Sequence, residues 1–248
     1  MEVELHRRRV YVGDWGRCSD PPRASVLLIH GAGMDHRVWA LLGRALACHG
    51  FHALAPDLPG HGRSQPLADC CSIEQQAAWL SDLLGVLPID RVSLIGHSMG
   101  GLVAMALAAR DPRVERLVLI GTAARMPVHP ALLAAARTDL PRAVAMIVSW
   151  AFAFARKIGA QPVPGVWMPM LAMRLLQASP PGILAQDLAA CDAWANGEAA
   201  ARAIRCPTLV LTGAEDRMTP PRAVSQLAEL IPQAEFLSLA GCGHMPIM

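Results

Sequence analysis

The sequence predicts an α/β fold, with a mostly parallel sheet, flanking helices and an inserted helical cap. Two observations lead to this prediction. Short apolar runs of strand length alternate with helix-like segments over residues 25–120 and again over residues 208–239. Between residues 126 and 198 the alternation stops, and segments rich in Ala, Leu, Met and Trp are broken by prolines. We therefore expect a core formed by residues 1–125 and 199–248 and a helical cap formed by residues 126–198.

Each strand is expected where a short run of apolar or β-branched residues stands between turn residues. The first, Leu5–Val12, alternates and carries three arginines, which is typical of a solvated edge strand. The other expected strands are Ser25–Ile29, His52–Pro56, Val92–Ile95, Val114–Ile120, Thr208–Leu211 and Glu235–Leu239. Helices are expected at Arg37–Cys48, Ser72–Leu87, Met99–Ala109 and Pro221–Ile231.

One serine stands at the junction of an expected strand and an expected helix. Ser98 follows the apolar run Val92–Ile95, and Gly96 and Gly100 flank it two positions away on either side. A tight strand-to-helix turn needs glycine there, because the two backbones approach too closely for a side chain. The pattern indicates a nucleophile elbow, which exposes the hydroxyl. The alternative is an ordinary turn with a capping serine.

Two further reactive side chains follow later strands. Asp216 lies in the turn after Thr208–Leu211, and His244 follows Glu235–Leu239. The carboxyl ends of parallel strands meet at one edge of the sheet, where α/β folds place their sites. The order Ser, Asp, His along the chain is the order found in sheet-and-helix hydrolases with a G-x-S-x-G elbow. The three side chains are therefore expected to converge.

These motifs resemble those of the α/β-hydrolase superfamily, in its capped serine esterase and thioesterase branch. Two more blocks carry the resemblance, namely His30–Gly33 and the segment Asp57–Ser64 with the sequence Asp-Leu-Pro-Gly-His-Gly-Arg-Ser. Together the blocks span nearly the whole chain. The resemblance implies Ser98 as nucleophile, His244 as general base, Asp216 as orienting acid, and the backbone N–H groups of Ala32 and Met99 as the oxyanion hole.

Rival assignments exist for the acid. Glu215 neighbours Asp216, but the family position is the second residue of the pair, which favours Asp216. Some relatives carry the acid after the strand that follows the elbow helix. In this chain the corresponding loop, Gly121–Arg125, contains no carboxylate.

The other histidines near the motifs suggest structural roles. His30, His61 and His97 lie beside motif glycines, and a buried ring hydrogen-bonded to backbone is the preferred interpretation for each. The nine histidines show no His-Glu-x-x-His or paired ligand spacing, so we expect no metal. The serine mechanism that the resemblance implies needs no cofactor.

The amino-acid composition argues against several classes of protein. The chain has 22 Lys and Arg against 20 Asp and Glu, and this small excess argues against nucleic-acid binding. The start, Met-Glu-Val-Glu, lacks the layout of a signal peptide, so a cytoplasmic location is expected. Seven cysteines, an odd number with two of them adjacent, do not suggest a disulfide framework and are expected to be reduced. Homo-oligomerisation is left open.

The cap is expected to select the substrate. The apolar run Val144–Ala155 is too short to span a membrane, which takes about 20 residues. A cap helix over the active site explains it better, and Met146, Trp150 and Trp167 are candidates for an apolar pocket wall. The alternative is that these side chains only pack the cap against the core. The cap contains no Lys or Arg cluster that would suggest a strongly anionic substrate, so an apolar acyl group is the simplest occupant.

The sequence therefore predicts a serine hydrolase that cleaves small-molecule carboxylic esters or thioesters through an acyl-enzyme. A lactone or carbon–carbon bond hydrolase is the alternative enzyme, because such relatives share the triad. A ligand sensor that retains the triad is the alternative from a different class, and ligand-induced stabilisation without turnover would distinguish it.

Overall fold

The computed structural model describes residues 1–16, 24–159 and 167–248. Its strands are β1 (Glu2–Leu5), β2 (Arg8–Asp14), β3 (Ser25–Ile29), β4 (His52–Pro56), β5 (Val92–His97), β6 (Val114–Ile120), β7 (Thr208–Gly213) and β8 (Ala234–Leu239). Among the described residues they form one sheet of eight strands in the order β1-β2-β4-β3-β5-β6-β7-β8. The pairs β1–β2 and β2–β4 are antiparallel, and all later pairs are parallel. The predicted α/β class with a mostly parallel sheet is confirmed.

The amino-terminal edge differs from the prediction of one strand at Leu5–Val12. The chain instead folds into a hairpin, in which β1 pairs with β2 and Leu5 lies opposite Arg8. His6 and Arg7 form the two-residue turn, with φ angles of 53° and 59°. Two consecutive residues at positive φ are characteristic of a type I′ turn, which usually contains Asn or Gly. The sequence lacks that signal, so the turn could not be recognised in advance.

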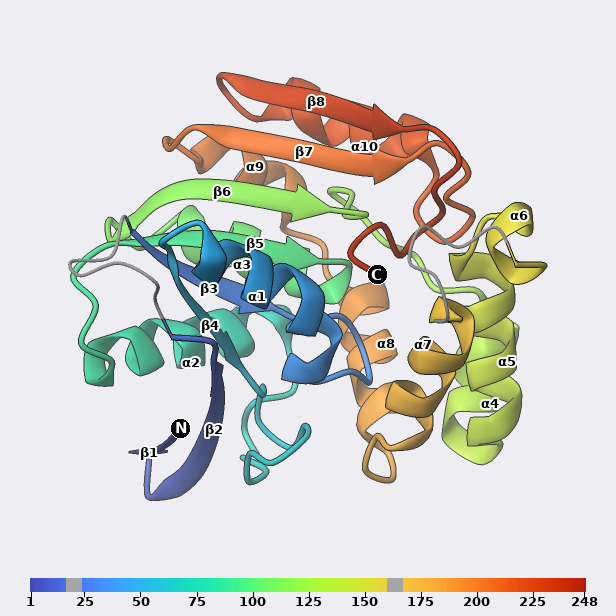
Figure 1. Ribbon diagram of the computed structural model, residues 1–248, viewed down its shortest axis with the longest axis horizontal. Helices are drawn as coiled ribbons and strands as arrows, with labels where there is room; N and C mark the ends of the chain where they lie inside the picture. The colour runs from blue at the N-terminus through green and yellow to red at the C-terminus, as the bar shows by residue number, and fades with distance from the viewer. Residues whose placement is uncertain (17–23, 160–166) are drawn as a thin grey trace.

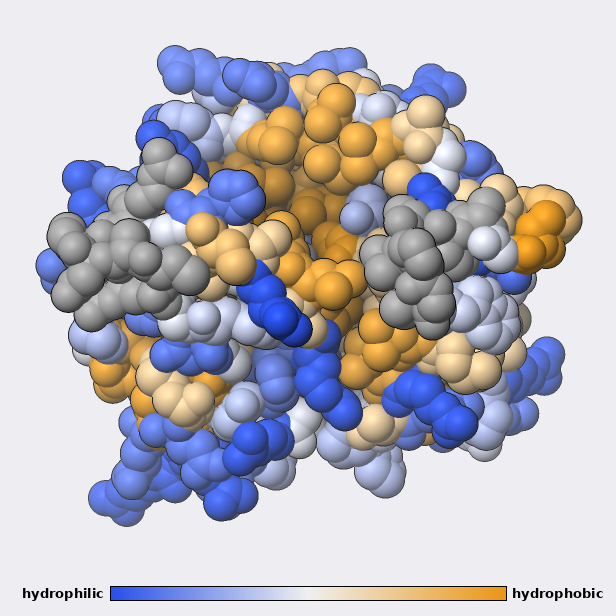
Figure 2. Space-filling model, viewed as in Figure 1, coloured by the Kyte–Doolittle hydropathy of each residue, from blue (hydrophilic) through white to orange (hydrophobic). Residues whose placement is uncertain are grey.

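Helices cover the two faces of the sheet unequally. On one face α2 (Ile73–Val86), α3 (Met99–Ala108), α9 (Gly197–Ala203) and α10 (Pro221–Leu230) share one apolar cluster with the strands. On the other face lie the short 3₁₀ helix His36–Trp39 and α1 (Ala40–Cys48), drawn in front of the sheet in Figure 1. Figure 2 shows hydrophobic residues gathered in the middle of this second face. Phe236 and Leu237 of the edge strand β8 are 42% and 44% exposed.

Helices α4 (Pro130–Thr138), α5 (Leu140–Ala151), α6 (Phe154–Lys157), α7 (Met168–Gln177) and α8 (Ile183–Ala193) lie between β6 and β7 in the chain. They gather beyond the carboxyl ends of β5–β8, to the right in Figure 1. The apolar run at residues 144–155 is not one helix, because α5 ends at Ala151 and α6 begins at Phe154. Helix α5 buries Ala143, Val144, Ile147 and Val148, a spacing that places them on one helical face. No helix within the described ranges is long and apolar enough to cross a membrane.

Candidate active site

Ser98 occupies a strained turn between β5 and α3. Its φ and ψ angles are 54° and −120°, a conformation that side-chain-bearing residues rarely adopt. The Ser98 N–H donates to the carbonyl of Ile120 at 2.8 Å, which ties the turn to the end of β6. A Cβ on Gly96 would collide with the backbone of Gly100, and one on Gly100 would collide with the carbonyl of Ile29. Glycine is thus required at both positions, as the sequence indicated.

His244 and Asp216 form a buried pair. The His244 Nδ1 lies 2.8 Å from Asp216 Oδ2, and both residues are at most 4% exposed. The second carboxylate oxygen of Asp216 accepts the backbone N–H groups of Met218 and Thr219, each at 2.8 Å. The His244 backbone N–H donates to the carbonyl of Ala151 at the end of α5, at 2.7 Å. Both partners are therefore fixed, and the cap helix α5 helps to hold the histidine loop.

Ser98 and His244 open into the same cavity of about 760 Å³. Its lining also includes Gly31 and Ala32 from the loop after β3 and Trp150 from α5. A Cβ on Gly31 would lie 3.4 Å from Ser98 Cβ, so this loop passes close to the serine. Met99 is the first residue of α3, and the N–H groups of the first helical turn have no acceptor within the helix. The structure thus gathers Ser98, His244 and Ala32 around one cavity, with Met99 next to Ser98.

His97 contacts the loop that carries His244. It is buried, its Nε2 donates to the carbonyl of His244 at 2.8 Å, and the two rings lie 4.9 Å apart. Burial and the neighbouring His244 lower the pKa of His97 to about 3, so the ring is neutral at physiological pH. The predicted role, a buried ring hydrogen-bonded to backbone, agrees with this contact. Nothing in the sequence indicated that the acceptor belongs to His244.

The three cap residues predicted for the pocket wall have different surroundings in the structure. Trp150 lines the cavity and contacts the His129 ring, with centroids 5.8 Å apart. Met146 is half-buried and packs against an apolar cluster shared by the cap and the core, outside the cavity lining. Trp167 precedes α7, is 45% exposed and also lies outside the lining. Of the three, Trp150 alone is in the described lining, and a pocket role for Met146 and Trp167 stays a prediction.

Many residues of the cavity wall were not predicted from the sequence. Several of its residues come from the irregular loop between β6 and α4, which has no periodic pattern to indicate burial, and others from α4, α5, α8 and the loops after β7 and β8. These residues are Met126, Pro127, Val128, His129, Leu132, Ile147, Leu188, Met218 and Met245. Most are apolar, so the cavity suits a predominantly apolar group.

Two arginines also line the cavity, which the sequence analysis did not anticipate. Arg125 lies in the loop after β6, and Arg217 follows Asp216. Both side chains are exposed, and among the described residues neither has a hydrogen bond or ion pair from its guanidinium group. The described lining contains no Asp or Glu. These two arginines therefore place positive charge on the cavity wall.

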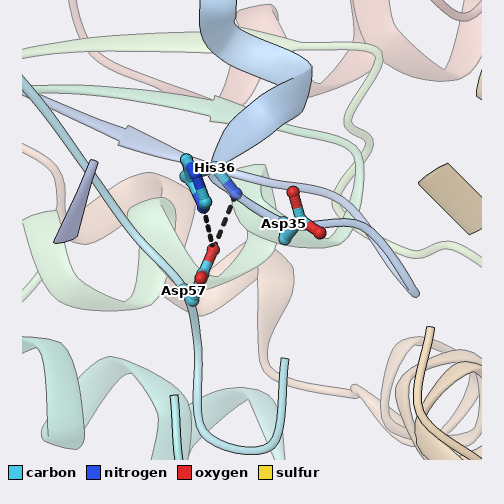
Figure 3. A group of neighbouring side chains, drawn as sticks. All are labelled: Asp35, His36 and Asp57. Carbon is cyan, nitrogen blue, oxygen red and sulfur yellow. Dashed lines mark hydrogen bonds and ion pairs between the residues drawn. The ribbon is translucent and has the colours of Figure 1, made fainter. Parts of the chain in front are cut away.

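A cluster of Asp35, His36 and Asp57 has the residue types of a metal site (Figure 3). These side chains already make hydrogen bonds within the protein. Asp57 accepts hydrogen bonds from the His36 Nδ1 and backbone N–H, both at 2.8 Å, and from the Arg63 backbone N–H at 2.9 Å. Asp35 pairs with Arg37 at 2.6 Å. Burial alone would raise the pKa of Asp35, but the hydrogen bonds and charge of Arg37 hold that pKa below its usual value. These contacts give the cluster a structural role in joining two loops.

Comparison with known proteins places these features in context. The family model described as the alpha/beta hydrolase fold matches residues 24–248. The chain is 32% identical to a pimeloyl-[acyl-carrier protein] methyl ester esterase from Aromatoleum aromaticum, covering 91% of this chain and 93% of that protein. It is also 32% identical to a 2-hydroxymuconate semialdehyde hydrolase from a Pseudomonas species, over 88% and 80% of the two chains.

Solved structures give the same picture. The enol-lactonase from Burkholderia xenovorans superposes with a TM-score of 0.86 at 27% identity, covering 99% of this chain and 93% of that chain. A thermophilic esterase from Thermogutta terrifontis superposes with a TM-score of 0.82 at 26% identity, covering 96% and 87%.

Proposed function

Because the chain belongs to the α/β-hydrolase family, we propose that it is a serine hydrolase that cleaves carboxylic esters or thioesters through an acyl-enzyme on Ser98. One observation carries the proposal: the strained Ser98 turn and His244, whose ring contacts the buried Asp216, line the same cavity. In this proposal the core at residues 1–125 and 199–248 supplies the reacting groups. The cap at residues 126–198 selects the acyl group.

The proposed reaction has two halves. The Ser98 Oγ attacks the substrate carbonyl carbon while its proton passes to His244 Nε2, and His244 then protonates the departing alcohol or thiol as that bond breaks. In the second half a water gives its proton to His244 and attacks the acyl carbon, which releases the acid and restores Ser98. Asp216 orients the ring through Nδ1 and stabilises the imidazolium.

We assign stabilisation of the tetrahedral oxyanion to the backbone N–H groups of Ala32 and Met99. Ala32 lines the cavity, and Met99 begins α3, whose N-terminus favours negative charge. Removing one donor from such a hole typically costs two to three powers of ten in kcat.

A chain-length series of p-nitrophenyl esters and acyl thioesters tests the proposed activity. We expect saturable turnover with a preference for apolar acyl groups, because the cavity volume of about 760 Å³ suits a small apolar ligand. Absence of turnover across both series, with ligand binding retained, would favour a binding protein over an enzyme.

Trp150→Ala is expected to change the acyl preference. Removing the indole from the cavity wall makes room for a longer chain. Since a hydrophobic pocket discriminates by about 1–3 kcal/mol per methylene, the kcat/KM ratio of long to short esters should rise about tenfold or more. Steady-state kinetics on the ester series measures this ratio.

Trp167→Ala is the matched control, because Trp167 lies outside the cavity and is exposed. Its chain-length profile should equal that of the wild type. If Trp150→Ala instead lowers all rates alike, or if both variants shift the profile equally, Trp150 does not determine acyl selectivity.

A lactone or carbon–carbon bond hydrolase is the second candidate, and the two arginines in the cavity wall favour it. The sequence offered few anchors for a substrate carboxylate, whereas Arg125 and Arg217 lie in the cavity wall. Guanidinium groups bind carboxylates through paired hydrogen bonds, and hydrogen bonds to charged groups contribute about 1.5–3 kcal/mol each. A substrate with a carboxylate remote from the scissile bond would fit this arrangement.

Arg125→Gln and Arg217→Gln are expected to raise KM about tenfold or more for a monoester of a dicarboxylic acid. The KM for a neutral ester of the same length should stay within about twofold, because the apolar wall is unchanged. Arg174→Gln, on α7 and outside the lining, is the control. Equal effects on charged and neutral esters would remove the support for an anionic substrate.

A further inference from the structure

A buried carboxylate joins the cap to the loop that carries Ala32. Asp187 lies on α8 and is 0% exposed. Its Oδ2 accepts the Gly33 backbone N–H at 2.8 Å and the His61 ring Nε2 at 2.7 Å. Its Oδ1 is buried and has no hydrogen-bond partner among the described residues. Burying a carboxylate is costly unless it is paired, so this contact requires an explanation beyond packing.

His61 supplies the compensating charge. Its Nε2 faces Asp187, and its Nδ1 faces the carbonyl of Pro59 at 3.1 Å. Both ring nitrogens face acceptors, so the doubly protonated imidazolium is the form that satisfies both contacts. Burial lowers the pKa of His61, but the charge and hydrogen bond of Asp187 outweigh that effect and raise it above the usual value. Asp187 and His61 thus form a buried ion pair between the cap and the Asp57–Ser64 loop.

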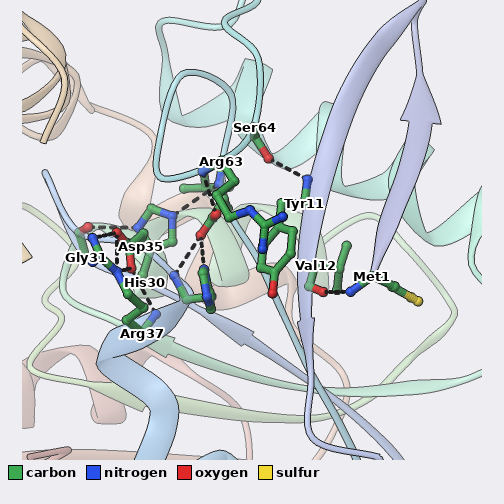
Figure 4. Close-up of polar contacts among 12 residues, drawn as sticks. Met1, Tyr11, Val12, His30, Gly31, Asp35, Arg37, Arg63 and Ser64 are labelled. Carbon is green, nitrogen blue, oxygen red and sulfur yellow. Dashed lines mark hydrogen bonds and ion pairs between the residues drawn. The ribbon is translucent and has the colours of Figure 1, made fainter. Parts of the chain in front are cut away.

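His30, in contrast, is held neutral beside this pair. The His30 and His61 rings lie 4.8 Å apart. His30 Nε2 accepts the Leu58 backbone N–H at 3.1 Å, so its proton is on Nδ1 and is donated to the carbonyl of Gly31 at 3.0 Å. Burial and the nearby His61 lower the pKa of His30 to about 4, which keeps this tautomer at physiological pH. Figure 4 shows His30 and Gly31 side by side in the same group of polar contacts as Asp35 and Arg37.

The hydrogen bond from His30 to the Gly31 carbonyl and the one from the Gly33 N–H to Asp187 fix the two peptide groups on either side of Ala32. The Gly31 carbonyl belongs to the same peptide as the Ala32 N–H, so the His30 bond orients and polarises the proposed oxyanion donor. The Gly33 N–H belongs to the next peptide, which Asp187 holds. Gly33 has a φ of +65°, and the Cδ1 of Leu184, also on α8, would contact a Cβ there at 2.8 Å. The loop is therefore clamped between the core and the cap.

We propose that Asp187 is a positioning residue that aligns the Ala32 N–H and makes the oxyanion hole dependent on the seating of the cap. The inference rests on the proposed function, since it needs an oxyanion at Ala32. It assigns to α8 a part in turnover beyond covering the substrate. The thiols of Cys70 and Cys191 are further titratable groups that interact electrostatically with Asp187.

Asp187→Ala and Asp187→Asn test the proposal by steady-state kinetics on the best ester. A misplacement of about 1 Å can cost about 100-fold, so Asp187→Ala should lower kcat about 10- to 100-fold and change KM less than threefold. Asp187→Asn keeps an acceptor but removes the charge, and its loss of kcat should be smaller. A trifluoromethyl ketone forms a tetrahedral adduct when Ser98 Oγ adds to its carbonyl carbon, and the former carbonyl oxygen becomes the oxyanion. Its affinity for the variant should fall by the same factor as kcat/KM.

Asp192→Asn is the matched control. Asp192 lies on the same helix and is exposed. Its carboxylate accepts the Val128 backbone N–H at 2.9 Å, and among the described residues it makes no hydrogen bond to the Ala32 loop. It should leave kcat and inhibitor affinity unchanged. Thermal unfolding identifies loss of the fold, and if Asp187→Ala fails to fold, the isosteric Asp187→Asn decides.

Folded Asp187 variants with wild-type kcat and inhibitor affinity would overturn the proposal, as would an equal loss in Asp192→Asn. A wild-type protein that neither hydrolyses esters nor reacts at Ser98 would instead overturn the proposed function. The two failures are therefore distinguishable.

Discussion

Ser98→Ala is expected to lower kcat for esters by about 10⁴- to 10⁶-fold, the largest effect of any single substitution in this chain. Alanine removes the atom that forms the acyl-enzyme, and no other hydroxyl takes its place in the turn between β5 and α3. Any remaining rate would come from water attack assisted by the oxyanion donors. Single-turnover measurements at high enzyme concentration provide the required sensitivity.

The fold should survive the Ser98 substitution. Alanine keeps the Cβ and the strained backbone, so the free energy of unfolding should stay within about 0.5 kcal/mol of the wild type. Ser149→Ala, at an exposed position of α5, is the control and should retain full activity. Ester turnover that survives Ser98→Ala would show that another group is the nucleophile.

Asp216→Asn is expected to lower kcat by about 10⁴-fold with little change in KM. The Met218 and Thr219 N–H groups both point at Asp216 Oδ1, so an asparagine would place its carbonyl there and turn its amide N–H₂ toward His244 Nδ1. An amide donor facing Nδ1 favours the histidine tautomer with its proton on Nε2, which cannot accept the Ser98 proton. The loss would therefore come from the wrong tautomer as well as the lost charge.

Glu215→Gln is the matched control for Asp216→Asn. Glu215 is the adjacent carboxylate, but it is exposed, and its only hydrogen bond among the described residues is made by its backbone N–H to the carbonyl of Cys242 at 2.8 Å. The kcat of the Glu215→Gln variant should stay within about twofold of the wild-type kcat. A large loss in Glu215→Gln together with an active Asp216→Asn would transfer the orienting role to Glu215.

The parallel part of the fold was predictable because its strands are short, largely apolar runs bounded by turn residues. The observed bounds of β3, β4 and β6 equal the predicted ones, and helix α2 begins after Ser72, whose side chain and Gln75 form a capping box. Helix and strand signals of this kind are local in sequence. The β1–β2 hairpin was missed because its turn residues, His6 and Arg7, adopt positive φ without the usual Asn or Gly.

The candidate site was predictable to the extent that its chemistry lies in short motifs. Ser98, Asp216 and His244 each follow a recognisable strand, and the topology brings these strand ends together. The cavity wall and the Asp187–His61 pair depend on contacts between residues far apart in the chain, such as 61 and 187. No local pattern distinguishes Asp187 from an ordinary solvent-facing carboxylate on a helix. These contacts form only when the cap helices pack against the core.

Covalent labelling with a fluorophosphonate identifies the nucleophile. We expect one adduct per chain, mapped by peptide mass spectrometry to Ser98, formed rapidly in the wild type and slowly in Asp216→Asn. The Ser98→Ala variant should not be labelled. Labelling at a residue other than Ser98, or equal labelling of wild type and Ser98→Ala, would contradict the assignment of Ser98 as the nucleophile of this hydrolase.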